Sequence, residues 1–132
     1  MPFHQLDLIR LPGRYAVCRL APDAAAPSGA AAGDFVSVTR TADELSVVCR
    51  EDAAPAGARR QPGWRLLRVA GAMDFALVGV LASLVTPLAE AGVGVFAVST
   101  FDTDYLFVKE AEFPAAVAAL RGAGHSVEGV LP

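Results

Sequence analysis

Residues 93–109 have the sequence VGVFAVSTFDTDYLFVK, in which a polar segment separates two apolar runs. The runs at 93–100 and 105–109 each have the length and the β-branched or aromatic character of a buried strand. The segment Phe101-Asp102-Thr103-Asp104 between them contains residues that favour turns, because their side chains bond nearby backbone groups. We therefore predict a β-hairpin over these residues.

A helix is expected on each side of this hairpin. Before it, apolar residues recur at the spacing of one helix face, after Asp74 as the candidate N-cap and with Pro87 in the last turn. These residues are Leu77, Leu81, Leu84, Val85 and Leu88. After the hairpin, Pro114 is suited to open a second helix, with Phe113, Val117 and Leu120 on one face.

Strands are expected at 64–69 and 126–131, which completes a β-α-β-β-α-β order in the second half of the chain. This order is that of the ferredoxin-like fold, an α+β architecture with two helices on one face of an antiparallel sheet. We predict that residues 61–132 form one domain.

The first half is predicted to contain mostly β-strands. We expect one hairpin from strands at 6–11 and 15–20 with a turn at Pro12-Gly13, and a second from strands at 35–40 and 45–50. Residues 21–33 are predicted to be a loop and 51–63 a linker, because both are rich in Pro, Gly and Ala. A shift of 60 residues places 38–45 on 98–105, so residues 1–60 are interpreted as a degenerate copy of the second half.

Several stretches resemble ACT domains: GAMDFALVGVL at 71–81, the run at 95–109, SVTRT at 37–41 and DELSVVC at 43–49. The chain resembles small bacterial ACT-domain proteins over roughly residues 6–125, and is similar to the ACT regions of aspartate kinases and to the eukaryotic cytosolic arginine sensor of the TOR pathway. The resemblance implies a degenerate ACT-like unit at 1–60, an ACT domain at 61–132, regulatory binding of a free amino acid and a homodimer. The loop at 21–33 lacks the aromatic residues expected of the family.

A receptor for a free amino acid needs donors for the carboxylate and an acceptor for the ammonium. The turn before the first helix offers backbone N–H groups at a helix N-terminus, and the polar segment of the hairpin offers acceptors. The 60-residue repeat places Thr39 and Arg40 at positions equivalent to Ser99 and Thr100, so the strand of the first half that contains them is expected to form the other wall of the site. The candidate ligand-binding residues are Gly71, Ala72, Met73, Asp74, Phe75, Ser99, Thr100, Asp102, Thr103, Asp104, Thr39 and Arg40.

Plainer readings of these residues stay open. Asp74 would serve equally as the cap of its own helix, and the polar hairpin residues would serve equally to satisfy the backbone of a turn. If the segment is extended, Thr100, Asp102 and Asp104 share one side. Two carboxylates fall short of the six to eight oxygens that Ca²⁺ takes, so no metal is expected.

Composition excludes other classes. The formal net charge is −3 with 11 Lys and Arg residues, so no basic nucleic-acid surface is expected. The most apolar stretch, 75–101, is broken by Pro87, Glu90 and glycines, so no membrane span is expected. Cys18 and Cys49 lie in apolar runs, which favours free thiols in the cytoplasm.

No nucleophile, phosphate-loop or dinucleotide motif is present, so we predict a non-catalytic protein without cofactor. The alternatives are a protein–protein assembly module that binds no ligand, and a small ferredoxin-like isomerase. An assembly module would show no response to amino acids, whereas a sensor would respond. An isomerase would turn over a substrate.

Overall fold

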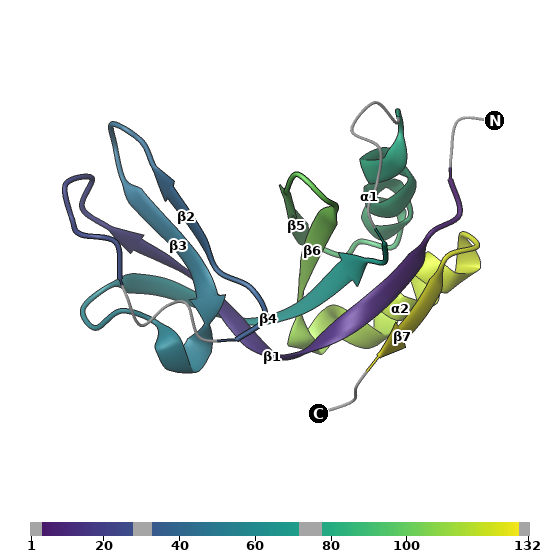
Figure 1. Ribbon diagram of the computed structural model, residues 1–132. Helices are drawn as coiled ribbons and strands as arrows, with labels where there is room; N and C mark the ends of the chain where they lie inside the picture. The colour runs from purple at the N-terminus through teal and green to yellow at the C-terminus, as the bar shows by residue number, and fades with distance from the viewer. Residues whose placement is uncertain (1–3, 28–32, 72–77, 130–132) are drawn as a thin grey trace. The chain divides into compact units, whose positions relative to one another are not determined.

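The computed structural model describes residues 4–27, 33–71 and 78–129. These residues belong to two compact units, one drawn from 1–12 and 65–132 and the other from 13–64. We call them the helical unit and the strand unit. The elements in chain order are β1 (Asp7–Leu20), β2 (Ser37–Arg40), β3 (Leu45–Arg50), η2 (Glu51–Ala53), β4 (Arg59–Val69), α1 (Val80–Glu90), β5 (Val95–Ser99), β6 (Asp104–Lys109), η3 (Glu110–Glu112), α2 (Phe113–Gly122) and β7 (Ser126–Gly129) (Figure 1).

The helical unit confirms the predicted α+β, ferredoxin-like order as β4-α1-β5-β6-α2-β7. Its strands lie in the order β7-β1-β4-β6-β5. The hairpin over 95–109 is present as antiparallel β5 and β6, with Phe96 opposite Phe107. β1 adds a strand between β4 and β7, and it runs parallel to β7. The first residues of the chain thus complete the sheet of the second half.

The core of the helical unit lies between the two helices and one face of its sheet. Alternate residues of β4 and β6 enter it, as expected for strands with one face covered by helices. The buried members are Leu8, Leu67, Val69, Leu84, Leu88, Val93, Leu106, Val108, Ala116, Leu120 and Val127. Among the described helices, none is long and apolar enough to span a membrane.

The first helix begins later than the sequence predicts. α1 starts at Val80, and Gly79 precedes it with a φ of 84° that suits glycine. The predicted cap Asp74 and the first residue of the predicted stripe, Leu77, lie outside the described residues. Leu84 and Leu88 are buried and Val85 packs against the core, which confirms this part of the stripe. Leu81 is 37% exposed, so its predicted place in the core is wrong.

The predicted hairpin at Pro12-Gly13 is wrong, because β1 continues through it for 14 residues. On one side of this dipeptide, residues 7–10 pair with β7, and on the other, residues 15–20 pair with β3. Gly13 adopts a φ of 95°, a backbone conformation that glycine takes readily, and β1 continues through it. The predicted linker at 51–63 is wrong too: β4 begins at Arg59 and runs through Pro62-Gly63.

The strand unit contains the predicted hairpin of β2 and β3, with Ser37 opposite Val48. Its strand order is β2-β3-β1, and its described residues include no α-helix. The core is small and consists of Ala16, Cys18, Leu45, Val47 and Cys49. Both cysteines are buried free thiols, as predicted. Whether this unit is a degenerate ACT copy stays a prediction.

Candidate functional site

The helical unit has a depression of about 270 Å³ where β4 ends and β6 begins. It is lined by Arg68, Gly71, Asp102, Thr103 and Tyr105. Three of these are candidate residues: Gly71 comes from one part of the sequence and the adjacent Asp102 and Thr103 from another, and the fold brings them together. Arg68 and Tyr105 are additional lining residues that the sequence analysis missed.

The polar segment before β6 is a closed turn rather than an extended chain. The backbone N–H of Thr100 donates to the carbonyl oxygen of Thr103 at 2.9 Å, and the Thr100 hydroxyl donates to the same oxygen at 3.0 Å. In return, the Thr103 N–H donates to the Thr100 Oγ1 at 3.3 Å. Because the turn closes, Asp102 is exposed while Asp104 is 8% exposed, and the condition for one shared side is not met.

Thr103 attaches this turn to β4. Its hydroxyl donates to the carbonyl oxygen of Val69 at 2.8 Å, and its side chain is buried. This bond satisfies the buried hydroxyl of Thr103. It also holds the turn beside Val69, the last residue of β4. Asp102 therefore lines the depression from a turn that is closed by the bonds between Thr100 and Thr103 and attached to β4 by the bond from Thr103 to Val69.

Replacing Thr103 by valine is expected to lower the free energy of unfolding by about 1–2 kcal/mol, because the Val69 carbonyl loses its donor in a buried place. Urea unfolding checks this value. Thr39→Val is the matched control, since Thr39 is exposed on β2. Equal effects of the two substitutions would contradict the anchoring role of Thr103.

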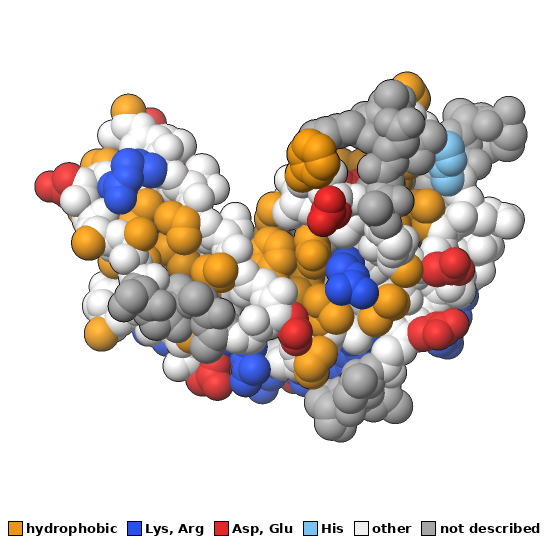
Figure 2. Space-filling view, in the orientation of Figure 1, with side chains coloured by type: hydrophobic (Ala, Val, Ile, Leu, Met, Phe, Trp, Pro, Cys, Tyr) orange, Lys and Arg blue, Asp and Glu red, His pale blue; other side chains and the backbone are white. Residues whose placement is uncertain are grey.

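Arg68 and Asp102 place opposite charges at the depression. Arg68 follows Leu67 and precedes Val69, both buried under the helices. Since adjacent strand residues point to opposite faces, Arg68 lies on the face away from the helices. The alternation of side chains between the two faces of the strand predicted at 64–69 could therefore have identified Arg68 as a residue of this face. In the same way, Tyr105 lies on the face opposite to that of its buried neighbour Leu106. Acidic and basic side chains lie among hydrophobic ones on the visible face of these strands (Figure 2).

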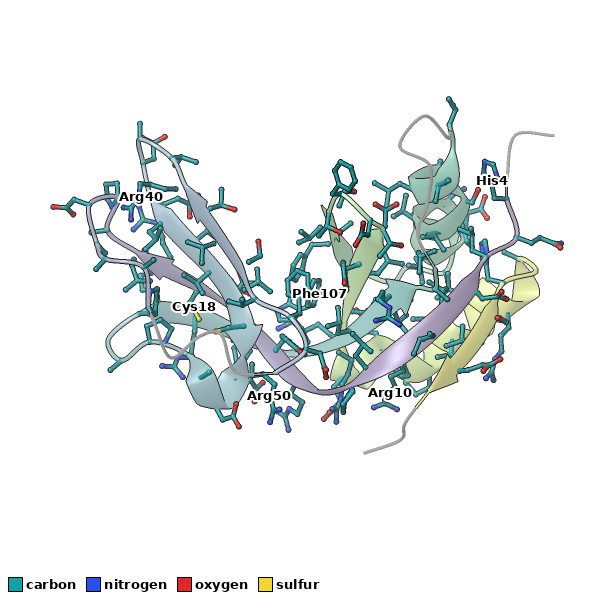
Figure 3. The ribbon with its side chains drawn as sticks, in the orientation of Figure 1. His4, Arg10, Cys18, Arg40, Arg50 and Phe107 are labelled. Atoms are coloured by element: carbon teal, nitrogen blue, oxygen red, sulfur yellow. The ribbon has the colours of Figure 1, made fainter. Side chains whose placement is uncertain are left out.

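Of the other candidate residues that the structure describes, none lines the depression. Ala72, Met73, Asp74 and Phe75 lie outside the described residues. Ser99 pairs with Asp104 in the β5–β6 register. Thr39 and Arg40 belong to β2 of the strand unit, where the Arg40 guanidinium donates to the backbone oxygens of Pro22 and Ala24 (Figure 3). His, Cys, Asp and Glu side chains of the described ranges form no group of three or more that could hold a metal.

Comparison with known proteins matches each part of the chain. A family model described as an ACT domain matches residues 59–122, and a model of an N-terminal domain matches residues 13–57. A crystal structure of an Agobacterium tumefaciens protein is 39% identical, covers 98% of this chain and 96% of its own, and has a TM-score of 0.91. No curated protein matches.

More distant structures share the fold. A Vibrio cholerae protein of unknown function, described as a possible transport protein, is 21% identical over 91% of each chain, with a TM-score of 0.72. The ligand-free regulatory subunit of aspartate kinase from Thermus thermophilus is 14% identical, covers 86% of this chain and 93% of its own, and has a TM-score of 0.59. At these identities the likeness concerns the fold alone.

Proposed function

The chain belongs to the ACT-domain family, and from that premise we propose that it is a regulatory protein, without catalysis of its own, that binds a free amino acid. The proposal includes a homodimer as the working assembly, as the family resemblance implies. It also includes the cytoplasm as the compartment, supported by two free cysteines, because thiols stay reduced there.

The observation that carries the proposal is that Arg68 and Asp102 line the same depression. A free amino acid is a zwitterion, so it needs a cation for its carboxylate and an anion for its ammonium group. The planar guanidinium of Arg68 suits a carboxylate, which it can bind through two parallel N–H donors. The exposed carboxylate of Asp102 suits the ammonium, and its turn is held by Thr100 and Thr103.

Gly71 and Tyr105 complete the lining of the depression. Gly71 has a φ of 77°, and among the residues that the structure describes none lies within 4 Å of the position that a Cβ would take, which favours close approach by a ligand. Tyr105 supplies an aromatic ring with a polar end, which suits a ligand that is part apolar and part polar.

A thermal-shift screen against the twenty amino acids tests the proposal, because a ligand that binds only the native state raises its stability by RT ln(1 + [L]/Kd). Calorimetry then measures the affinity of the best ligand. Asp102→Asn is expected to weaken binding more than tenfold, since charge-assisted hydrogen bonds contribute roughly 1.5–3 kcal/mol. The unfolding free energy should change little, because Asp102 is exposed.

Asp43→Asn is the control for general charge effects, since Asp43 lies in the exposed turn between β2 and β3. Asp104→Asn separates the two candidate anions, and loss of affinity there instead would move the ammonium site to Asp104. No response to any amino acid would contradict a sensor and favour the assembly module. Turnover of a substrate would contradict the non-catalytic role and favour the isomerase.

A further inference from the structure

A second depression in the helical unit lies between α2 and the neighbouring ends of β1 and β7. Its volume is about 570 Å³, more than twice that of the depression at Arg68. This falls within the range of about 300–1,000 Å³ typical of small-molecule sites. Apolar side chains of α2 and β7 form much of its wall, and the charged residues of the lining are Arg10, Arg121 and Glu128. The lining residues are Arg10, Phe113, Pro114, Val117, Arg121, Val127, Glu128 and Gly129.

Arg10 is the group in this wall whose bonding is incomplete. It lies on β1 opposite Gly129 of β7, and its side chain extends from β1 beside the end of β7 (Figure 3). The guanidinium carbon lies 4.3 Å from the centroid of the Phe113 ring, a cation–π contact that fixes its position. The Arg10 Nε is buried and has no hydrogen-bond partner among the residues that the structure describes.

Among the described residues around Arg10, the arginines Arg10, Arg65 and Arg121 outnumber the carboxylates Glu110 and Glu128. Arg65 is buried and forms an ion pair with Glu110 at 2.5 Å. Burial lowers the pKa of Arg10, the nearby Arg65 lowers it further, and the Glu110 carboxylate raises it electrostatically. Arg121 adds a second cation to the wall, where it donates to the backbone oxygen of Val127 at 2.8 Å. Glu128 is the acidic group of the lining.

We propose that this depression binds a monocarboxylate that carries an apolar body, with the carboxylate at Arg10 and the body against Phe113, Val117 and Val127. A planar carboxylate matches the donor geometry of a guanidinium. The apolar wall matches a hydrocarbon chain or ring, which gains free energy when it leaves water. Glu128 disfavours a dianion such as phosphate, because a second negative charge would meet its carboxylate.

This site is separate from the proposed amino-acid site. It is tested with a probe that has no ammonium group, so that the result does not depend on amino-acid binding. Hexanoate is added to ¹⁵N-labelled protein, and the amide resonances are followed by NMR. We expect saturable shifts over α2 and β7, and an affinity at least tenfold higher than that of 1-hexanol, which has the same chain without the carboxylate. Inorganic phosphate should not compete with hexanoate.

Arg10→Met keeps the apolar stem of the side chain and removes its charge, so it is expected to lower the affinity for hexanoate at least tenfold. Arg121→Gln, on an exposed side chain, is the second variant and should weaken hexanoate several-fold, which keeps the test valid if Arg10→Met does not fold. Arg59→Met is the matched control, because Arg59 is an exposed arginine of the strand unit. Asp102→Asn should leave hexanoate binding unchanged.

Four results would overturn the proposal. One is equal affinity for hexanoate and 1-hexanol, which would remove the role of the carboxylate. Another is competition by phosphate at similar affinity, which would make the site a general anion site. The third is hexanoate binding that folded Arg10→Met and Arg121→Gln both retain. Loss of hexanoate binding on Asp102→Asn would also overturn it, because it would place the ligand in the amino-acid depression.

Discussion

Replacing His125 by phenylalanine is expected to lower the free energy of unfolding by about 3–5 kcal/mol, the largest effect of any single change considered for this protein. His125 is 4% exposed and precedes β7. Its Nδ1 accepts a hydrogen bond from the backbone N–H of Leu6 at 3.0 Å, and its Nε2 lies 2.7 Å from the backbone oxygen of Ser83. These partners require a neutral ring with its proton on Nε2.

The magnitude follows from what the substitution leaves behind. Phenylalanine has neither a donor nor an acceptor, so the Leu6 N–H and the Ser83 carbonyl lose their partner together. Each buried group left without a partner costs about 1–3 kcal/mol. His125 also joins three segments, because Leu6 leads into β1 and Ser83 lies in α1. Loss of the ring therefore loosens the attachment of β1 to the helical layer.

Urea unfolding of the variants tests this account. His125→Gln should have an intermediate effect, because its amide can still donate toward Ser83 but leaves Leu6 unpaired. His4→Phe is the matched control: the His4 ring bonds the backbone oxygen of Val78 at 2.8 Å in an exposed place, so its loss should cost less than about 1 kcal/mol. Equal stability of His125→Phe and the parent would contradict the role assigned to His125.

Between about pH 9 and 11 the protein is expected to lose about 2–3 kcal/mol of stability through the thiol of Cys49. Cys49 is fully buried in the strand unit, on β3 opposite Ala16. Burial raises the pKa of its thiol to about 11 from an ordinary value of 9.0, with a further contribution from Cys18. The two thiols are diagonal neighbours across β1 and β3, since Cys18 pairs with Val47.

The sign follows from proton binding. Above pH 9 the Cys49 thiol of the unfolded chain releases its proton, whereas in the folded chain it keeps the proton until about pH 11. The folded state then binds more protons, so the free energy of unfolding falls as the pH rises. The stabilisation is complete below pH 9 and is lost as the pH approaches 11. Burial also raises the pKa values of Cys18 and Tyr15, which add in the same direction.

Urea unfolding at a series of pH values measures this loss, and Cys49→Ala isolates it. The alanine variant should be less stable than the parent at neutral pH, because it leaves a small cavity. Its stability should nevertheless fall less steeply above pH 9. A thiol reagent should label the native protein slowly and both cysteines rapidly after denaturation. Parallel pH profiles of parent and variant, or rapid native labelling of both thiols, would contradict the assignment.

The sequence by itself determined the elements in which the local residue pattern favours the same conformation as the packing in the folded protein. The hairpin of β5 and β6, the helix opened by Pro114 and the overall β-α-β-β-α-β order all follow from periodicity and turn residues. The turn at residues 100–103 follows for the same reason. Each depends on residues that are close in sequence, where spacing and turn chemistry are informative.

Tertiary structure decided the rest, because partners distant in sequence outweigh a local preference. Pro12-Gly13 and Pro62-Gly63 are turn dipeptides in isolation, yet β1 and β4 continue through them. β1 does so because β7 pairs with one of its ends and β3 with the other. The residues of the proposed site could be predicted only in part, for a related reason. Arg68 becomes a candidate for carboxylate binding only when β4 lies beside β6 and brings its guanidinium to the same depression as Asp102, a pairing between strands that sequence spacing does not encode.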